Sequence, residues 1–104
     1  MLLTVCETSI FSQRAKEIWS DSEREQFIVW IAANPLIGDV IPNTGGLRKV
    51  RWQSQGRGKR GGARVIYYNV LEGGEIYLLM IYTKNKFDDL PPKLYKILKE
   101  TIHG

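Results

Sequence analysis

The chain has 104 residues, of which 43% are apolar, 25% charged and 11% aromatic, and its formal net charge is +4. This composition is typical of a soluble globular protein and excludes a fully disordered chain, while the length suits one domain over residues 1–104. Because no run of eighteen apolar residues and no export signal is found, we expect a cytoplasmic protein that does not enter a membrane.

The N-terminal third predicts one strand and two helices. Residues 2–7 are partly β-branched and predict a strand. Apolar side chains then recur at helical spacing over residues 10–19. Ser22 and Glu25 have the spacing of a capping box, which predicts the start of a second helix that ends before Pro35. These two helices should form a hairpin.

The rest of the chain predicts a loop, three strands and a last helix. Residues 35–46 are rich in turn formers and predict a packed loop. Runs of strand-forming residues follow at 47–53, 63–71 and 75–84, and a helix should begin after Pro91. The order β-α-α-β-β-β-α predicts an α+β fold, in which the helical hairpin covers one face of a small, mainly antiparallel sheet.

The positive charge is concentrated in one segment. No acidic residue occurs between Asp39 and Glu72, and residues 48–64 hold seven of the fifteen Lys and Arg. Such a field attracts polyanions, above all nucleic acid, although a solvated basic loop without function is the alternative. The glycine-rich part, residues 53–62, should be a mobile loop. We expect the RNA or ribosome contacts to come from Arg48, Arg57, Lys59 and Arg60.

Other cations lie on predicted strands. Lys49 and Arg51 alternate along one strand and should share a face. Arg64 begins the next strand, and in an antiparallel meander the end of the third strand, with Lys84, lies beside it. An unpaired guanidinium in an apolar strand is costly, so Arg64 needs a carboxylate such as Glu75, solvent, or an anionic ligand.

This set suits RNA cleavage without a metal or cofactor, and the sequence has no pattern typical of a zinc, phosphate-loop or dinucleotide site. Attack by a ribose 2′-hydroxyl on its phosphate needs a base, an acid, and cations that stabilise the phosphorane. Arg64 has the chemistry for the last task. A lysine crowded by other cations has a lowered pKa and could transfer protons, while Tyr68 or Tyr82 could stack on a base, donate a proton, or simply pack in the core.

The segments GLRKVRW, GKRGGARVIYY and IYLLMIYTKNK resemble the RelE/HigB-type toxins of bacterial toxin–antitoxin modules, most closely the HigB branch with a glycine-rich basic loop. The resemblance covers nearly the whole chain. It implies a RelE/ParE fold and ribosome-dependent cleavage of mRNA in the A site, which inhibits translation. It also implies a cognate antitoxin, expected to be a helix-turn-helix protein from the same operon.

The resemblance also implies roles for single residues. Arg64 matches the family arginine of the Gly-x-Arg-x-x-Tyr strand, which stabilises the transition state, and Lys49 and Arg51 match two alternating lysines. Lys84 matches a lysine after the last strand, where Lys86 compensates for a neighbouring family arginine that is Asn85 here. The expected catalytic set is Arg64, Lys49, Arg51, Lys84, Lys86, Tyr68 and Tyr82.

Two rival functions remain open at this point. A ParE-like protein inhibits DNA gyrase and has no nuclease activity, and it shares the fold that the resemblance implies. A non-catalytic RNA-binding module would use the basic loop alone, and its affinity would fall steeply with salt.

Overall fold

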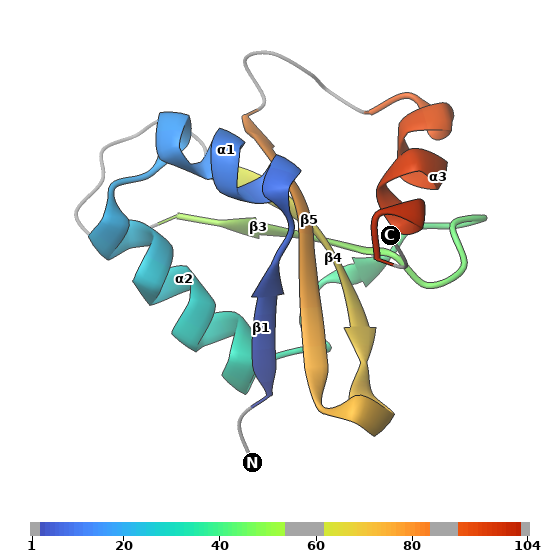
Figure 1. Ribbon diagram of the computed structural model, residues 1–104, viewed down its shortest axis with the longest axis horizontal. Helices are drawn as coiled ribbons and strands as arrows, with labels where there is room; N and C mark the ends of the chain where they lie inside the picture. The colour runs from blue at the N-terminus through green and yellow to red at the C-terminus, as the bar shows by residue number, and fades with distance from the viewer. Residues whose placement is uncertain (1–2, 54–61, 84–89, 103–104) are drawn as a thin grey trace.

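The computed structural model describes residues 3–53, 62–83 and 90–102. Helices and strands follow one another in nearly the predicted order (Figure 1). The elements are β1 (Thr4–Glu7), α1 (Ser9–Ile18), α2 (Asp21–Ala33), β2 (Asp39–Val40), β3 (Arg48–Trp52), β4 (Ala63–Val70), the 3₁₀ turn η1 (Leu71–Gly73), β5 (Glu75–Thr83) and α3 (Pro92–Glu100).

The strands form one five-stranded sheet in the order β1-β5-β4-β3-β2. β1 pairs with β5 in parallel, whereas every other neighbouring pair is antiparallel. The first strand of the chain, β1, therefore lies at one edge of the sheet beside the last strand, β5. The predicted α+β class with a mainly antiparallel sheet is confirmed.

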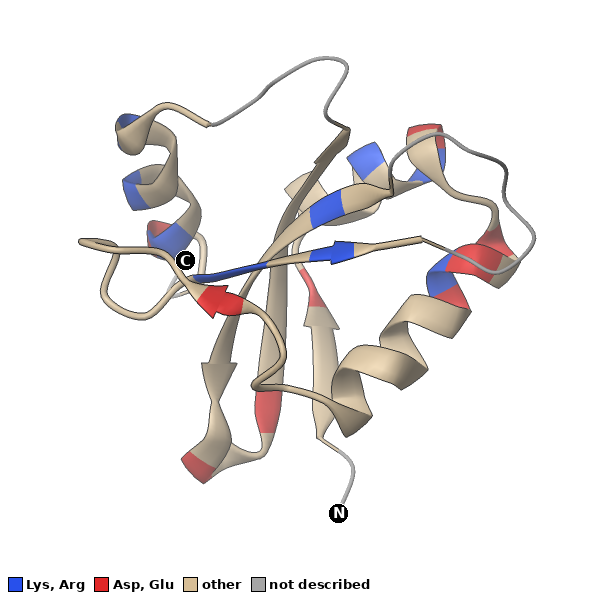
Figure 2. Cartoon of the chain, turned by 180° about the vertical axis from the view of Figure 1, so that it is seen from behind, with Lys and Arg blue, Asp and Glu red and all other residues tan. Residues whose placement is uncertain are grey.

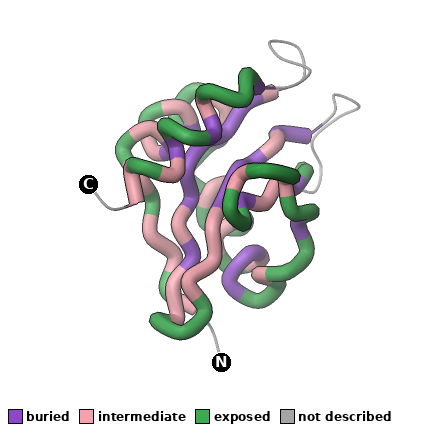
Figure 3. The backbone as a smooth tube through the Cα atoms, turned by 90° about the vertical axis from the view of Figure 1, so that its right-hand side faces the viewer, coloured by how far each residue is buried: buried purple, intermediate pink, exposed green. Residues whose placement is uncertain are grey.

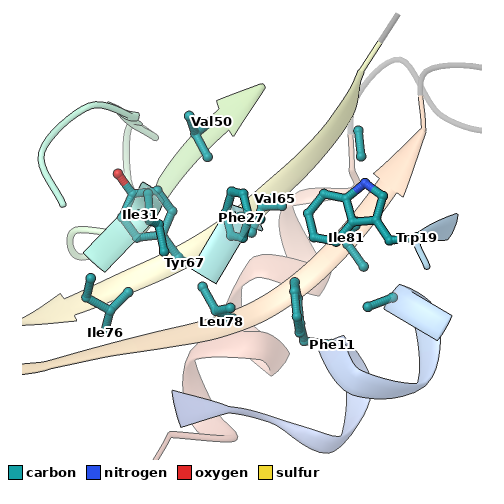
Figure 4. Close-up of a cluster of buried hydrophobic side chains, with 12 residues drawn as sticks. Phe11, Trp19, Phe27, Ile31, Val50, Val65, Tyr67, Ile76, Leu78 and Ile81 are labelled. Atoms are coloured by element: carbon teal, nitrogen blue, oxygen red, sulfur yellow. The ribbon is translucent and has the colours of Figure 1, made fainter. Parts of the chain in front are cut away.

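The helical hairpin covers one face of this sheet, as predicted. Phe11 of α1 and Phe27 of α2 are fully buried against Val65, Tyr67 and neighbouring side chains of the strands (Figure 4). An aromatic group that includes Trp19 lies in this cluster, with the rings of Trp19 and Phe27 5.1 Å apart. Burial of this apolar surface holds α1 and α2 against the sheet.

α3 lies on the opposite face, so both faces of the central strands are covered (Figures 1 and 3). Tyr95 and Leu98 of α3 pack with Ile66 of β4 and Leu79 of β5. This double burial explains why the sequences of β4 and β5 are almost continuously apolar rather than alternating.

The second helix starts two residues earlier than the predicted capping box. Ser20 is the cap: its Oγ accepts a hydrogen bond from the Glu23 N–H at 3.2 Å, and the Glu23 carboxylate accepts one from the Ser20 N–H at 2.9 Å. Ser22 and Glu25 lie inside α2 instead. Both pairs fit the pattern, but the buried Trp19 places the turn directly before Ser20.

One strand was not predicted. Residues 39–40 lie in the segment expected to be a loop, yet they pair with β3, Asp39 opposite Lys49 and Val40 opposite Arg48. A strand of two residues is too short to produce an alternating pattern. It forms because the segment before it is fastened to the sheet by the Tyr67 hydroxyl, which accepts a hydrogen bond from the Gly38 N–H at 2.9 Å.

Candidate functional site

Arg51, Arg64 and Tyr82 form a row across three neighbouring strands. Arg51 of β3 is opposite Arg64 of β4, and Arg64 is opposite Tyr82 of β5. Opposite residues of antiparallel strands share a face with Cβ atoms about 4.5–5.5 Å apart. Tyr82 packs in the cluster that includes α3, so the row lies on the α3 side of the sheet. Figure 2 shows the basic positions side by side on β3 and β4.

A bulge in β5 determines which residue faces Arg64. Ile66 pairs with Met80, but the next residue, Tyr67, pairs with Leu78, so Leu79 has no partner in the register. The extra residue reverses the alternation in the second half of β5. Tyr82 therefore points to the α3 side, next to Arg64.

The two arginines of this row have no acidic partner among the described residues. All ion pairs found in that part of the chain involve Arg24, which contacts Glu7 at 3.6 Å and Asp21 at 3.9 Å. Arg51 is exposed and Arg64 is partly buried. One guanidinium nitrogen of Arg64, Nη1, is buried and makes no hydrogen bond. Like charges directly opposite each other are destabilising, so this pair favours an anion.

The structure excludes Glu75 as the partner of Arg64. Glu75 is opposite Val70, at the far end of the β4–β5 hairpin, whereas Arg64 is opposite Tyr82 near its start. The Glu75 carboxylate instead accepts a hydrogen bond from the Tyr77 hydroxyl at 3.3 Å. Desolvation, followed by the charge of Glu75, raises the pKa of the Tyr77 phenol above its usual value. The acidic end of the hairpin is thus separate from the cations.

Lys49 lies in the next row along β3. It is opposite Ile66 of β4 and opposite Asp39 of β2, on the same side of the sheet as Arg51. The prediction that Lys49 and Arg51 share a face is therefore confirmed. Lys49 and Asp39 also line a groove of about 460 Å³ between β2 and the start of α3.

The two candidate tyrosines, Tyr68 and Tyr82, differ in how far their rings are exposed to solvent. Tyr82 is 1% exposed, so the protein covers its ring and the ring cannot stack on a base in this arrangement. Tyr68 is partly exposed, and the Lys99 Nζ lies 5.3 Å from the centre of its ring. Lys99 of α3 thus covers part of the Tyr68 ring. Its ammonium is held in this position by a hydrogen bond that it donates to the Gly45 carbonyl at 2.9 Å.

The basic residues predicted to grip RNA are only partly described. Arg48 lies in β3 but on the other side from Lys49, and its guanidinium donates hydrogen bonds to the carbonyls of Leu36 at 3.2 Å and Gly38 at 2.7 Å. This gives Arg48 a structural role, which the sequence did not indicate. The remaining predicted contacts and two of the predicted catalytic cations lie outside the described residues: Arg57, Lys59, Arg60, Lys84 and Lys86.

The two ends of the basic loop, at Trp52 and Gly62, are held by contacts with neighbouring residues, whereas residues 54–61 between them lie outside the described part of the chain. Trp52 ends β3 opposite Ala63, and its ring lies 5.2 Å from that of Trp19. A Cβ atom at Gly62 would collide with the Trp52 carbonyl, so the two arms approach too closely for any other residue. The sequence did not identify Trp52 as the residue that anchors this loop.

Two further observations limit what the described part of the chain contains. None of its helices is both long and apolar enough to cross a membrane. Within the same ranges, no three His, Cys, Asp or Glu side chains gather as metal ligands would.

Comparison with known proteins supports the fold. No protein-family model matches the sequence. Among solved structures, the chain is similar to an arginine double mutant of the Escherichia coli toxin RelE in the free state, with a TM-score of 0.62 and 12% sequence identity. The match covers 85% of this chain and 90% of that chain. The chain therefore has a RelE-like α+β fold.

Proposed function

We propose that residues 1–104 form one toxin domain of a bacterial toxin–antitoxin module, of the HigB type, which cleaves translated mRNA on the ribosome. The observation that carries this proposal is the opposed pair of Arg51 and Arg64, with the buried Nη1 of Arg64 left without a hydrogen bond. A phosphate placed between them would accept hydrogen bonds from both guanidinium groups and remove their repulsion. The RelE-like fold is consistent with the proposal. Because one fold can carry several functions, the assignment rests on these residues and not on the fold.

The proposed reaction needs only groups that RNA and protein supply. A base removes the proton of a ribose 2′-hydroxyl, the 2′-oxygen bonds to the adjacent phosphorus, and the bond from phosphorus to the 5′-oxygen breaks as an acid protonates that oxygen. The products are a 2′,3′-cyclic phosphate and a 5′-hydroxyl. Arg64 stabilises the charge of the phosphorane, while Arg51 and Lys49 hold the neighbouring phosphates.

We assign the proton transfers to Lys84, Lys86 and Tyr68 of the predicted catalytic set, because the hydroxyl of Tyr82 is buried and does not reach the RNA. Lys84 and Lys86 directly follow β5, whose last residues pair with the start of β4. Tyr68 and Tyr82 lie on the same side of the sheet as Arg64. The partly exposed Tyr68 is better placed for a base or a sugar than the buried Tyr82.

The expected partners follow from this activity. The loop cations Arg57, Lys59 and Arg60 would contact the ribosome or the message in the cytoplasm. A cognate antitoxin, a helix-turn-helix protein encoded in the same operon, would neutralise the toxin. Because the stretch between Asp39 and Glu72 holds seven of the fifteen Lys and Arg and no acidic residue, we expect an acidic segment of the antitoxin to interact with it.

The decisive experiment is primer extension on an mRNA incubated with the protein, with and without translating ribosomes. We expect cuts only with ribosomes, and a loss of about 10²–10³-fold in the cleavage rate for Arg64→Ala, the typical effect of removing one transition-state donor. Arg64→Lys should recover only part of the rate, because lysine keeps the charge but loses the planar fork. Lys16→Ala, an exposed charge on α1, is the matched control.

The possible outcomes separate the candidate functions. If Arg64→Ala melts like the parent protein and cleaves equally fast, Arg64 is not catalytic. If the parent protein leaves mRNA intact but traps gyrase on DNA, the ParE-like alternative is correct. Binding without any cut product would indicate a non-catalytic RNA-binding module.

A further inference from the structure

The groove beside Lys49 has no role in the reaction described above. It runs between the edge of the sheet and the start of α3 and has a volume of about 460 Å³. One wall contains Asp39 and Ile41, and the other contains Leu90, Pro92 and Tyr95. Pockets that bind small organic groups usually measure about 300–1,000 Å³ and combine apolar walls with a few polar groups.

The position of this groove connects it to the cation row. Lys49 lines the groove, and Arg51 follows two residues later on the same side of β3. Successive residues on one face of a strand lie about 6.6–6.8 Å apart. This distance is close to the spacing of successive phosphates along an RNA strand. A nucleotide whose phosphate contacts the arginines can therefore place its base toward Lys49 and the groove.

The chemistry of the groove distinguishes between bases. Asp39 is exposed, lies opposite Lys49 on the α3 side, and forms no ion pair with another described residue. An ionised carboxylate only accepts hydrogen bonds. Guanine presents two adjacent N–H donors on its Watson–Crick edge, whereas adenine, cytosine and uracil each present an acceptor next to their donor.

We propose that this groove binds a guanine base of the RNA substrate, with Asp39 accepting hydrogen bonds from the guanine N1–H and N2–H₂ groups. The exposed Pro92, together with the part of Tyr95 that lines the groove, gives the base an apolar wall to pack against. The positive charge of Lys49 favours the adjoining phosphate and the O6 atom of guanine. The assignment rests on the proposed function, because only an RNA substrate brings a base to this place.

The first test measures binding without cleavage. Trinucleotides with 2′-O-methyl riboses, UGU, UAU, UCU and UUU, lack the attacking hydroxyl and are titrated into the full chain while amide resonances are followed by NMR. We expect UGU to bind roughly tenfold more tightly than the others and to shift the resonances of Asp39 and Tyr95, since one bidentate base contact typically discriminates by this much. Asp39→Asn should abolish the preference.

Asp21→Asn is the matched control, because Asp21 is an exposed aspartate at the start of α2, on the helical-hairpin side of the sheet. It should leave the preference for UGU unchanged. Equal affinities for all four trinucleotides, an unchanged preference in Asp39→Asn, or shifts confined to another surface would each overturn the proposal. Groove resonances that respond to the antitoxin and to none of the trinucleotides would also overturn it and assign the groove to a protein partner.

The second test maps the cut sites on ribosome-bound mRNA. The parent protein should cut preferentially next to guanine, and Asp39→Asn should lose this preference relative to Asp21→Asn. If the parent cuts without preference for guanine, the groove assignment fails while the proposed function stands. If it cuts nothing but binds UGU in the groove, the nuclease proposal fails while the groove remains a guanine site.

Discussion

The Tyr67 hydroxyl fastens the segment before β2, and its removal should measurably destabilise the protein. Tyr67 is fully buried. Its hydroxyl accepts a hydrogen bond from the Gly38 N–H at 2.9 Å and donates one to the Pro35 carbonyl at 2.8 Å. The substitution Tyr67→Phe keeps the ring in the core while it deletes both hydrogen bonds.

The magnitude follows from what each partner loses. The Pro35 carbonyl keeps a second hydrogen bond, from the Asn69 side-chain amide at 2.8 Å, so it remains satisfied. Gly38 is buried, and its N–H loses its hydrogen bond. An unsatisfied buried donor costs about 1–3 kcal/mol. We expect the free energy of unfolding to fall by about 2 kcal/mol and Tm to fall by roughly 8 °C.

Urea unfolding followed by tryptophan fluorescence measures this change, because Trp19 lies in the same core cluster as Tyr67. Tyr68→Phe is the matched control, since no hydrogen bond to a described residue involves the Tyr68 hydroxyl. It should change the free energy of unfolding by no more than about 0.5 kcal/mol. A value for Tyr67→Phe within that same margin of the parent protein would refute the reasoning.

The pH dependence offers an independent check. Burial, the main cause, raises the pKa of the Tyr67 phenol above its usual value of about 10, and Asp39 adds to this effect, although Gly38 and Arg48 oppose it. The folded state thus holds this proton more tightly than the unfolded state. The resulting stability is complete below about pH 10 and is lost as the pH rises through the folded pKa. The stability advantage over Tyr67→Phe should therefore shrink above about pH 10, whereas a growing advantage would contradict this assignment.

Two further predictions concern local structure. Ser20→Ala should lower the free energy of unfolding by about 1 kcal/mol because it removes the helix cap, whereas Ser22→Ala, inside α2, should have almost no effect in the same urea experiment. Equal effects would mean that the cap is not at Ser20. Gly62→Ala should cost about 1–3 kcal/mol, because its methyl group would collide with the Trp52 carbonyl, while Gly73→Ala serves as a control with more room. Thermal unfolding by circular dichroism compares the last two variants, and an unchanged Tm for Gly62→Ala would show that the loop root adapts.

Much of this architecture could be predicted because its signals are local. Helical spacing located α1, α2 and α3, and the alternation of side chains in β3 placed Lys49 and Arg51 on one face. Errors arose where local signals were ambiguous or too short. Ser20 and Ser22 both fit a capping box, and only the burial of Trp19 selects the first. The two residues of β2 carry no alternating pattern at all.

The amino-acid sequence by itself determined the concentration of positive charge, the order of helices and strands, and the need of Arg64 for a partner. Only the tertiary structure decided which groups meet. The bulge at Leu79 brought Tyr82 opposite Arg64, the register of the hairpin placed Glu75 at its far end, and β2 set Asp39 opposite Lys49. The physical reason is that strand register is fixed by packing between residues far apart in the chain, and periodicity within one strand carries no information about it.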